Sequence, residues 1–269
     1  MNKMKRLKKI LIDLKSVVVA YSGGLDSTFL LKAAIDALGS DDVLAVTARS
    51  ETYPDSEYKE ACALAKKFGA KHITIRTKEL DIKNFRANPV NRCYYCKKEL
   101  FKKLDEIRKR RKMGAVLDGT NCDDLKDIRH GARAAKELGV KSPLLEAGIN
   151  KDDIRKFSKA MKLPTWSKPS FACLASRFPF HSDITLKGLR DIDKTEAYLR
   201  RLGFKQVRVR LHKEIARIEL SAEEFAKALR LRAPITDKLK ELGFVYVTLD
   251  LQGYRTGSMH ETVGGGDKR

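Results

Sequence analysis

Residues 17–31, VVVAYSGGLDSTFLL, constrain the fold more than any other stretch of the chain. Val17 to Ala20 form a short, β-branched run, which is typical of a strand buried on both faces. The run ends at a glycine turn, Ser22 to Gly24, and a helix is predicted from Asp26 to Leu38, before Gly39. A strand, a glycine turn and a helix start in this order direct backbone N–H groups and the positive end of the helix dipole at an anion. The stretch therefore predicts a phosphate site at the end of the first strand.

The glycine turn is not a Walker A motif, which has a Lys-Ser/Thr pair after its second glycine. It resembles instead the SGGxDS signature of the PP-loop ATP pyrophosphatases, in which the loop holds the pyrophosphate part of ATP and AMP is transferred to a substrate oxygen. The alternative is an ordinary strand–turn–helix with Asp26 as the N-cap residue. The resemblance makes the following residues candidate ATP ligands: Ser22, Gly23, Gly24, Asp26 and Ser27.

The segments after this loop alternate between short apolar runs and helical patterns. Further strands are predicted at 43–48, 72–76 and 115–117, with a helix at 54–68. This alternation predicts an α/β fold, a doubly wound parallel sheet of Rossmann-like type with the nucleotide at the carboxyl ends of the strands. Thr47 and Ala48 end the second strand and would then flank the adenine or the ribose. This PP-loop domain is expected to cover residues 1–180.

The loop after the fourth strand, residues 118–124, is acidic and contains a glycine. Because a parallel strand delivers its following loop to the nucleotide, this loop supplies candidate ligands: Gly119, Thr120 and Asn121. Asp123 and Asp124 could hold Mg²⁺ on the phosphates or cap the next helix, and the sequence favours neither. Farther along the chain, Arg129 could face the phosphates or the substrate.

A second, smaller α+β domain is expected over residues 184–263. After a linker at 180–183, the sequence predicts helices at 185–202 and 223–231, a strand hairpin from 207–211 and 215–220, and a last strand at 244–249.

The formal net charge is +21, which permits nucleic-acid binding. Much of it lies in 97–112 and 200–217, but anionic small substrates also attract arginines. No apolar stretch approaches the ~18 residues of a membrane span, and the basic N-terminus lacks the apolar region of a signal peptide. These features predict a cytoplasmic protein that does not enter the membrane.

Three of the five cysteines lie in distinctive surroundings. Cys93 and Cys96 form a CxxC before a basic helix, where the helix N-terminus favours thiolates. Such a pair could serve structural zinc, a redox dithiol or an iron–sulfur cluster. Cys173 lies in a proline- and aromatic-rich stretch, 163–179, which predicts a rigid loop presenting a thiol beside Arg177.

Several segments together resemble the LarE family over nearly all of residues 15–255: NRCYYCKKELF, LDGTNCDDL, KELGVKSPLLEAG, LPTWSKPSFACLASRFP and LGFKQVRVR, in addition to SGGLDS. The resemblance implies a sulfur transferase of nickel-pincer cofactor synthesis. Using ATP and Mg²⁺, members adenylate a carboxylate of pyridinium-3,5-biscarboxylic acid mononucleotide. Sulfur then replaces AMP and gives a thiocarboxylate.

The family divides by its sulfur source. One type has a single cysteine, matching Cys173, and sacrifices its own sulfur. The other resembles enzymes in which three cysteines, matching Cys93, Cys96 and Cys173, hold a 4Fe–4S cluster that carries a sulfide for transfer. Because all three are present, the resemblance implies a cluster enzyme supplied by sulfide or by a sulfur donor.

The resemblance also implies residue roles outside the PP-loop. Arg208 and Arg210 should grip the substrate phosphate, with Ser176 and Arg177 nearby, and Glu196 resembles a position that can bind a divalent metal. Together with Asp26, the catalytic set is then Cys173, Ser176 and Arg177. Members assemble into oligomers, so a homo-oligomer is expected.

Other functions share parts of this pattern. A tRNA thiolase also combines a PP-loop, three cysteines and a basic surface, but many such enzymes carry paired CxxC zinc modules that this chain lacks. An amidotransferase would leave the cysteines without a role. A non-enzymatic ATP-binding module with structural zinc would release no pyrophosphate.

Overall fold

A computed structural model describes residues 2–126, 130–169, 172–255 and 258 of the chain. Its contacts divide the chain into two compact units. The first contains residues 1–79 and 91–171, and the second contains residues 80–90 and 172–269. None of the described helices is long and apolar enough to cross a membrane.

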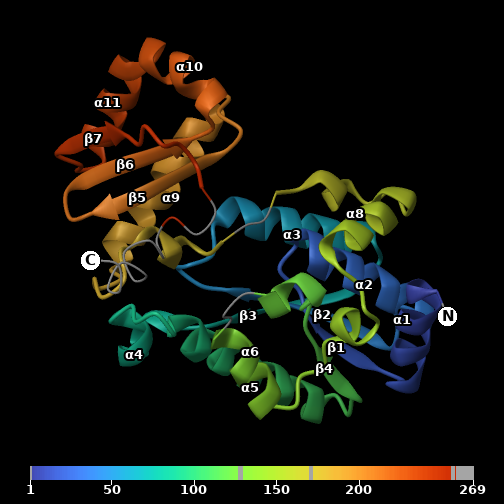
Figure 1. Ribbon diagram of the computed structural model, residues 1–269. Coiled ribbons are helices and arrows are strands. Elements are labelled where there is room, and N and C mark those ends of the chain that lie inside the picture. The colour runs from blue at the N-terminus through green and yellow to red at the C-terminus, as the bar shows by residue number, and fades with distance from the viewer. Residues whose placement is uncertain (1, 127–129, 170–171, 256–257, 259–269) are drawn as a thin grey trace. The chain divides into compact units, whose positions relative to one another are not determined.

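The first unit is built on a parallel four-stranded sheet (Figure 1). Its strands are β1 (Val17–Ala20), β2 (Val43–Arg49), β3 (Lys71–Arg76) and β4 (Ala115–Leu117), in the spatial order β3-β2-β1-β4. Val17 lies opposite Val43 on one side and Ala115 on the other. The direction of strand addition therefore reverses beside β1, which places a topological switch point at its carboxyl end.

Helices cover both faces of this sheet (Figure 1). The apolar run of β1 alternates between the two faces, because Val17 and Val19 pack into one hydrophobic core and Val18 into the other. The first core includes residues of α1 (Lys3–Asp13), α2 (Leu25–Leu38), α3 (Asp55–Lys67) and α8 (Lys151–Ala160). The second includes residues of α5 (Arg92–Arg110) and α6 (His130–Glu137). The predicted doubly wound α/β fold is confirmed.

Two local features of the first unit differ from the sequence-based expectation. Helix α5 begins at Arg92, so the CxxC, which was predicted to precede this basic helix, lies at its N-terminal end instead. The stretch from 163 onward contains a short 3-10 turn, Pro164–Ser167, because proline is compatible with the first position of a helical turn. The remaining helix, α7 (Pro143–Glu146), is one turn long.

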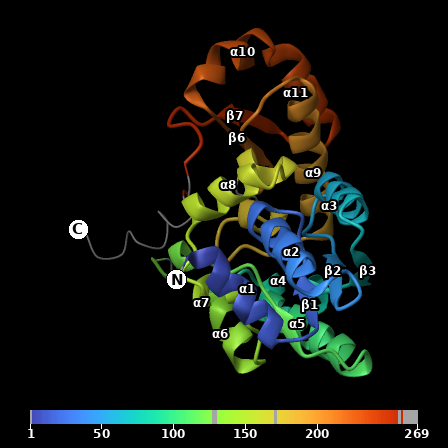
Figure 2. The same cartoon turned by 90° about the vertical axis from the view of Figure 1, so that its right-hand side faces the viewer.

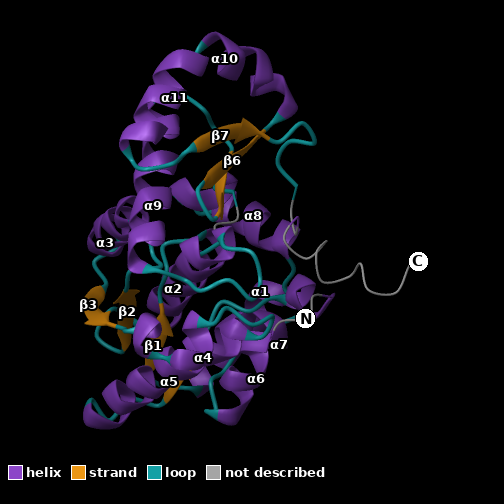
Figure 3. Ribbon diagram, turned by 90° about the vertical axis from the view of Figure 1, so that its left-hand side faces the viewer, coloured by secondary structure: helices purple, strands orange, loops and turns teal. Residues whose placement is uncertain are grey.

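The second unit contains a three-stranded sheet with helices beside it (Figures 2 and 3). Its elements are α4 (Lys83–Arg86), α9 (Leu186–Arg201), β5 (Val207–His212), β6 (Ile215–Leu220), α10 (Phe225–Arg230), α11 (Arg232–Glu241) and β7 (Tyr246–Leu249). β5 and β6 form the expected antiparallel hairpin, and β7 adds parallel to β6. Helix α11 was not among the predicted helices. Its Pro234 falls in the first turn, where no N–H is needed.

Asn88 explains why residues 80–90 belong to the second unit. Its backbone adopts a positive φ of 53°, which asparagine tolerates better than most residues. The buried side-chain amide donates to the carbonyl oxygens of Pro179 at 2.6 Å and Phe178 at 3.3 Å. The backbone N–H of His181 donates in return to the Asn88 carbonyl at 3.0 Å. Two distant stretches of chain are thereby joined.

Candidate functional site

The glycine turn after β1 has the geometry expected of an anion-binding loop. Gly23 has a φ of 63°, which disfavours residues other than glycine. A Cβ atom there would also lie 2.7 Å from the Cβ of Ala61 on α3, which is too close. Ser27 Oγ accepts a hydrogen bond from the N–H of Ser22 at 3.3 Å and donates to the Gly24 carbonyl at 3.3 Å. Gly24 is the N-cap of α2 and makes no side-chain capping bond. The first turn of α2 therefore lacks a side-chain cap, as expected of a helix start that binds a phosphate.

The loop after β4 lies against this turn. A Cβ atom on Gly119 would lie 3.2 Å from the Ser27 nitrogen and 3.3 Å from the Asp26 Cβ, so glycine permits the close approach. Thr120 donates from its hydroxyl to Asp118 at 2.8 Å. Asn121 is fully buried, and its side-chain nitrogen makes no hydrogen bond within the described residues. The structure thus brings one candidate ligand of this loop, Gly119, against Asp26 and Ser27 of the PP-loop.

The end of β2 lies next to the same region. The N–H of Tyr21 donates to the Val46 carbonyl at 2.9 Å, which sets Thr47 beside the residue that precedes the PP-loop. Thr47 is buried, and its hydroxyl lies 2.8 Å from Nε2 of His72. Burial lowers the pKa of His72, so the ring is neutral near pH 7. Ala48 is half-buried in the next position.

Two lysines that the sequence did not single out contact the PP-loop region. Lys151, at the start of α8, forms an ion pair with Asp26. Lys168 follows the 3-10 turn and pairs with two glutamates of α3. A helix-start lysine such as Lys151 was identifiable only through its N-cap Asn150, and nothing in the sequence connected Lys168 to the loop.

The CxxC lies at the start of α5. Cys93 is exposed and Cys96 is half-buried, and their spacing puts both on one side of the helix. The Cys96 thiol donates to Oε1 of the buried Glu79, at a sulfur–oxygen distance of 3.9 Å. Desolvation raises the pKa of Glu79. Within the described part of the chain, no three His, Cys, Asp or Glu side chains are grouped so as to hold a metal ion.

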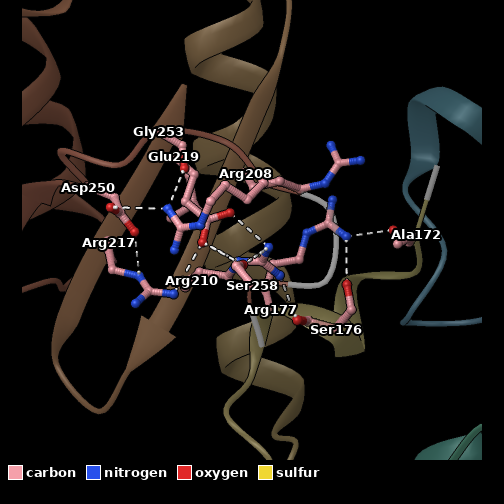
Figure 4. A network of polar contacts seen from close by, with 12 residues as sticks. Ala172, Ser176, Arg177, Arg208, Arg210, Arg217, Glu219, Asp250, Gly253 and Ser258 are labelled. Atoms are coloured by element: carbon pink, nitrogen blue, oxygen red, sulfur yellow. Dashed lines mark hydrogen bonds and ion pairs between the residues drawn. The ribbon is translucent and has the colours of Figure 1, made fainter. Parts of the chain in front are cut away.

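In the second unit, Arg177 fixes the backbone around Cys173, and Figure 4 shows its contacts with Ala172 and Ser176. Its side chain is completely buried, and Nη1 donates to the carbonyls of Ala172 at 2.6 Å and Cys173 at 3.1 Å. Ser176 Oγ donates to the same Cys173 carbonyl at 2.8 Å. The backbone that presents the Cys173 thiol is therefore held by Arg177 and Ser176.

Glu196 of α9 balances the charge of Arg177. Its carboxylate accepts from Nε and Nη2 of Arg177 at 2.9 and 3.0 Å, from Arg200 at 2.8 Å and from the N–H of Val209 at 3.1 Å. Burial acts to raise the pKa of Glu196, but the neighbouring arginines outweigh it and hold the pKa below its ordinary value. The carboxylate is bound by cations and an amide, and its expected role as a metal ligand stays a prediction.

Arg208 and Arg210 lie two apart on β5 and are both nearly buried (Figure 4). Arg210 forms a bidentate pair with Glu219 at 2.9 and 2.8 Å and donates to the Ser176 carbonyl at 2.9 Å. The guanidinium of Arg208 lies 5.3 Å from the ring centre of Tyr254. Its pKa is lowered by burial and by the charge of Arg177.

The second unit thus gathers the residues expected around the substrate phosphate: Ser176, Arg177, Arg208 and Arg210, with the backbone of Cys173. The first unit gathers the residues expected around ATP: Ser22, Gly23, Gly24, Asp26, Ser27, Thr47, Ala48, Gly119, Thr120 and Asn121. Arg129, expected at the phosphates, lies outside the described residues.

Known proteins match this chain at two levels. Residues 4–114 match the NAD synthase family. A protein named pyridinium-3,5-bisthiocarboxylic acid mononucleotide synthase, from Lactiplantibacillus plantarum, is 40% identical over 261 residues, which cover 97% of this chain and 95% of that protein. The chain belongs to the LarE family. An uncharacterized protein of Synechocystis is 42% identical over 97% of this chain and 98% of its own length. Another, from Methanocaldococcus jannaschii, is 31% identical over 94% of this chain and 96% of its own length.

Membership of the LarE family agrees with the PP-loop built around Gly23 and Gly24, because both indicate an enzyme that uses ATP. The match to the synthase covers 97% of this chain, so it includes the second unit with its buried arginines as well as the first unit.

Proposed function

We propose that this protein is an ATP-dependent sulfur transferase that adenylates a carboxylate of pyridinium-3,5-biscarboxylic acid mononucleotide and replaces AMP with sulfur to give a thiocarboxylate. The observation that carries the proposal is the likeness over 97% of the chain to a protein named as the synthase of the bisthiocarboxylic acid mononucleotide. The contents of the two units support the proposal. The first contains a glycine turn suited to a phosphate, and the second contains a buried arginine cluster beside a cysteine.

Adenylation is assigned to the first unit. The amides of Ser22 to Ser27 bind the departing pyrophosphate, and their fixed dipoles stabilise its charge as it leaves. Thr47 and Ala48 flank the adenine or the ribose, Gly119, Thr120 and Asn121 line the nucleotide from the β4 side, and Arg129 faces the phosphates. The ammonium group of Lys151 forms an ion pair with Asp26, and its backbone N–H donates a hydrogen bond to the Asp123 carboxylate at 2.8 Å. Carboxylate oxygens are the protein ligands that Mg²⁺ prefers, so Asp26 and Asp123 are the residues that would hold it, and when bound it would supply positive charge to the phosphates.

Binding of the mononucleotide phosphate is assigned to the second unit. Arg208 and Arg210 bind this phosphate, and Arg177 and Ser176 hold the Cys173 backbone beside it. Buried guanidinium groups suit a phosphate because they carry a permanent positive charge, which Arg210 supplies although its paired Nε and Nη2 donors bind Glu219.

Sulfur delivery is assigned to Cys93, Cys96 and Cys173. Thiolates are the usual ligands of iron–sulfur clusters, and the CxxC puts two of them on a single helical turn, so the donor type fits a 4Fe–4S cluster. Such a cluster, when bound, supplies the sulfide, which comes from free sulfide or a sulfur donor. Glu196 stays a proposed site for a divalent metal, and we propose a homo-oligomer as the assembly.

An iron assay on single-cysteine variants tests the cluster. After anaerobic reconstitution, the wild-type chain should contain about four iron atoms and lose them on Cys93→Ala, Cys96→Ala or Cys173→Ala. Cys62→Ala is the matched control and should keep the iron, because Cys62 lies on α3 and is not one of the three proposed ligands. If the wild-type protein contains no iron and loses the mass of H₂S during turnover, the cluster hypothesis is wrong and Cys173 is a sacrificial sulfur donor.

The net charge of +21 favours a second candidate, a tRNA thiolase. If the substrate is the small nucleotide, a gel-shift assay should show no tRNA binding at about 0.15 M salt, where exposed charges more than ~8 Å apart are screened. Tight tRNA binding that weakens steeply as salt increases would support the thiolase instead.

A further inference from the structure

Lys168 is held in one position by three separate contacts. Its ammonium nitrogen lies 2.8 Å from a carboxylate oxygen of Glu57, 2.8 Å from one of Glu60, and 3.4 Å from the carbonyl oxygen of Gly23. The side chain is only 13% exposed. Arg155 of α8 also binds its backbone, donating to the Lys168 carbonyl at 3.3 Å. Ordering a long lysine side chain costs conformational entropy, so these contacts indicate that Lys168 has a role at the PP-loop.

The two glutamates lie on the face of α3 that supports the PP-loop. Glu60 and Ala61 follow Glu57 by three and four positions, and Ala61 is the residue against which Gly23 packs. Because Lys168 touches both carboxylates and the Gly23 carbonyl, both negative charges lie well within the screening length of about 8 Å from the loop.

The negative charge of these glutamates reaches the loop. Tyr53 donates from its hydroxyl to the Ser22 carbonyl at 2.7 Å. Its pKa is raised, first by burial and next by the charge of Glu57, with a further contribution from Glu60. A triphosphate bound at Ser22 to Ser27 would meet the same repulsion unless a cation offset it.

We propose that Lys168 is a positioning residue of the nucleotide site, which neutralises Glu57 and Glu60 and holds Gly23 against α3 so that the loop accepts a polyanion. The proposal rests on the proposed function only in that the PP-loop binds ATP. It gives the proline- and aromatic-rich stretch a second role, since its first half acts on ATP binding and its second half carries Cys173.

Charge-matched variants test this role through ATP affinity, measured by calorimetry on the full chain with Mg²⁺. Lys168→Gln should weaken ATP binding about tenfold, because two carboxylates are left unopposed near the phosphates. Lys168→Arg should bind within about threefold of wild type. The exposed Lys159, which lies 5.0 Å from the Trp166 ring, supplies the control, and Lys159→Gln should leave affinity unchanged.

Removing the carboxylates separates neutralisation from direct binding. Lys168→Gln combined with Glu57→Gln and Glu60→Gln should recover most of the lost affinity, and the two glutamine changes alone, with Lys168 intact, should tighten ATP binding. Rising salt should narrow the gap between wild type and Lys168→Gln. These shifts are not expected from a purely structural lysine.

Three results overturn the proposal: unchanged affinity in Lys168→Gln, no recovery in the triple variant, or weaker binding when only the glutamates are replaced. Failure of recovery would mark Lys168 as a direct phosphate ligand. The proposed function fails separately, if wild-type protein binds ATP but forms no thiocarboxylate from the pyridinium mononucleotide.

Discussion

Replacing Cys173 with alanine should stop thiocarboxylate formation while AMP formation from ATP stays within about threefold of wild type. The structure supports this separation, because Arg177 and Ser176 bind the carbonyl of Cys173 and not its thiol. An alanine keeps that carbonyl and the hydrogen bonds that the carbonyl accepts. Only the sulfur is lost, so the backbone around residue 173 is preserved.

Asp26→Ala is the complementary variant, and it should reduce AMP formation by about a hundredfold or more. Asp26 lies in the first turn of α2, against Gly119, and pairs with Lys151. Both variants are checked by measuring AMP by chromatography and thiocarboxylate by mass spectrometry in the same reaction. Thiolation at the wild-type rate by Cys173→Ala would remove this cysteine from the mechanism.

The nucleotide-binding fold was predictable because its signals are local. The β-branched run of 17–20 and the glycines that follow it specify a buried strand and an anion-binding turn before any tertiary contact is known. The alternation of Val17, Val18 and Val19 between two cores follows directly from strand geometry. The hairpin of β5 and β6 was predictable for the same reason, from its alternation and short turn.

The carboxylate partners of the buried arginines were not predicted, although one of them had a signal. The two-residue turn at 213–214 fixes the hairpin register, so Arg208 lies opposite Glu219 and Arg210 lies diagonal to it. That register already indicates a cross-strand ion pair, and the structure gives Glu219 to Arg210. Glu196 comes from a different element, α9, so its contact with Arg177 depends on packing that no local pattern encodes.

Long-range contacts account for the other omissions. Asn88 joins residues 80–90 to the second unit through two carbonyls about ninety positions away in the chain, a bond that has no periodicity to detect. Lys168 reaches Glu57 and Glu60 across more than a hundred residues, and an isolated lysine before a proline carries no signal of burial. The site residues that the sequence analysis missed are those whose role depends on a contact with a residue far away in the sequence.

Replacing Glu196 with glutamine should destabilise the second unit by about 3–5 kcal/mol, since removing one partner of a buried ion pair leaves its charge uncompensated. Glutamine matches the size of glutamate, so the loss reports charge rather than a cavity. The Glu196→Gln substitution leaves the positive charge of Arg177 completely buried, with the positive charge of Arg208 near it. Arg200→Gln is the control, because Arg200 is 33% exposed and its pair with Glu196 is worth at most about 1 kcal/mol.

Urea unfolding followed by circular dichroism measures this effect, and Trp166, the single tryptophan, reports on the first unit by fluorescence. Glu196→Gln should lower the dichroism midpoint more than the fluorescence midpoint. The pKa of Glu196 is depressed in the folded chain, so its contribution is present above the unfolded pKa near 4.3 and is lost as pH falls through the folded value. The gap between wild type and Glu196→Gln should therefore close in acid. A gap that stays constant down to pH 3 would mean that the carboxylate charge does not stabilise the arginine cluster.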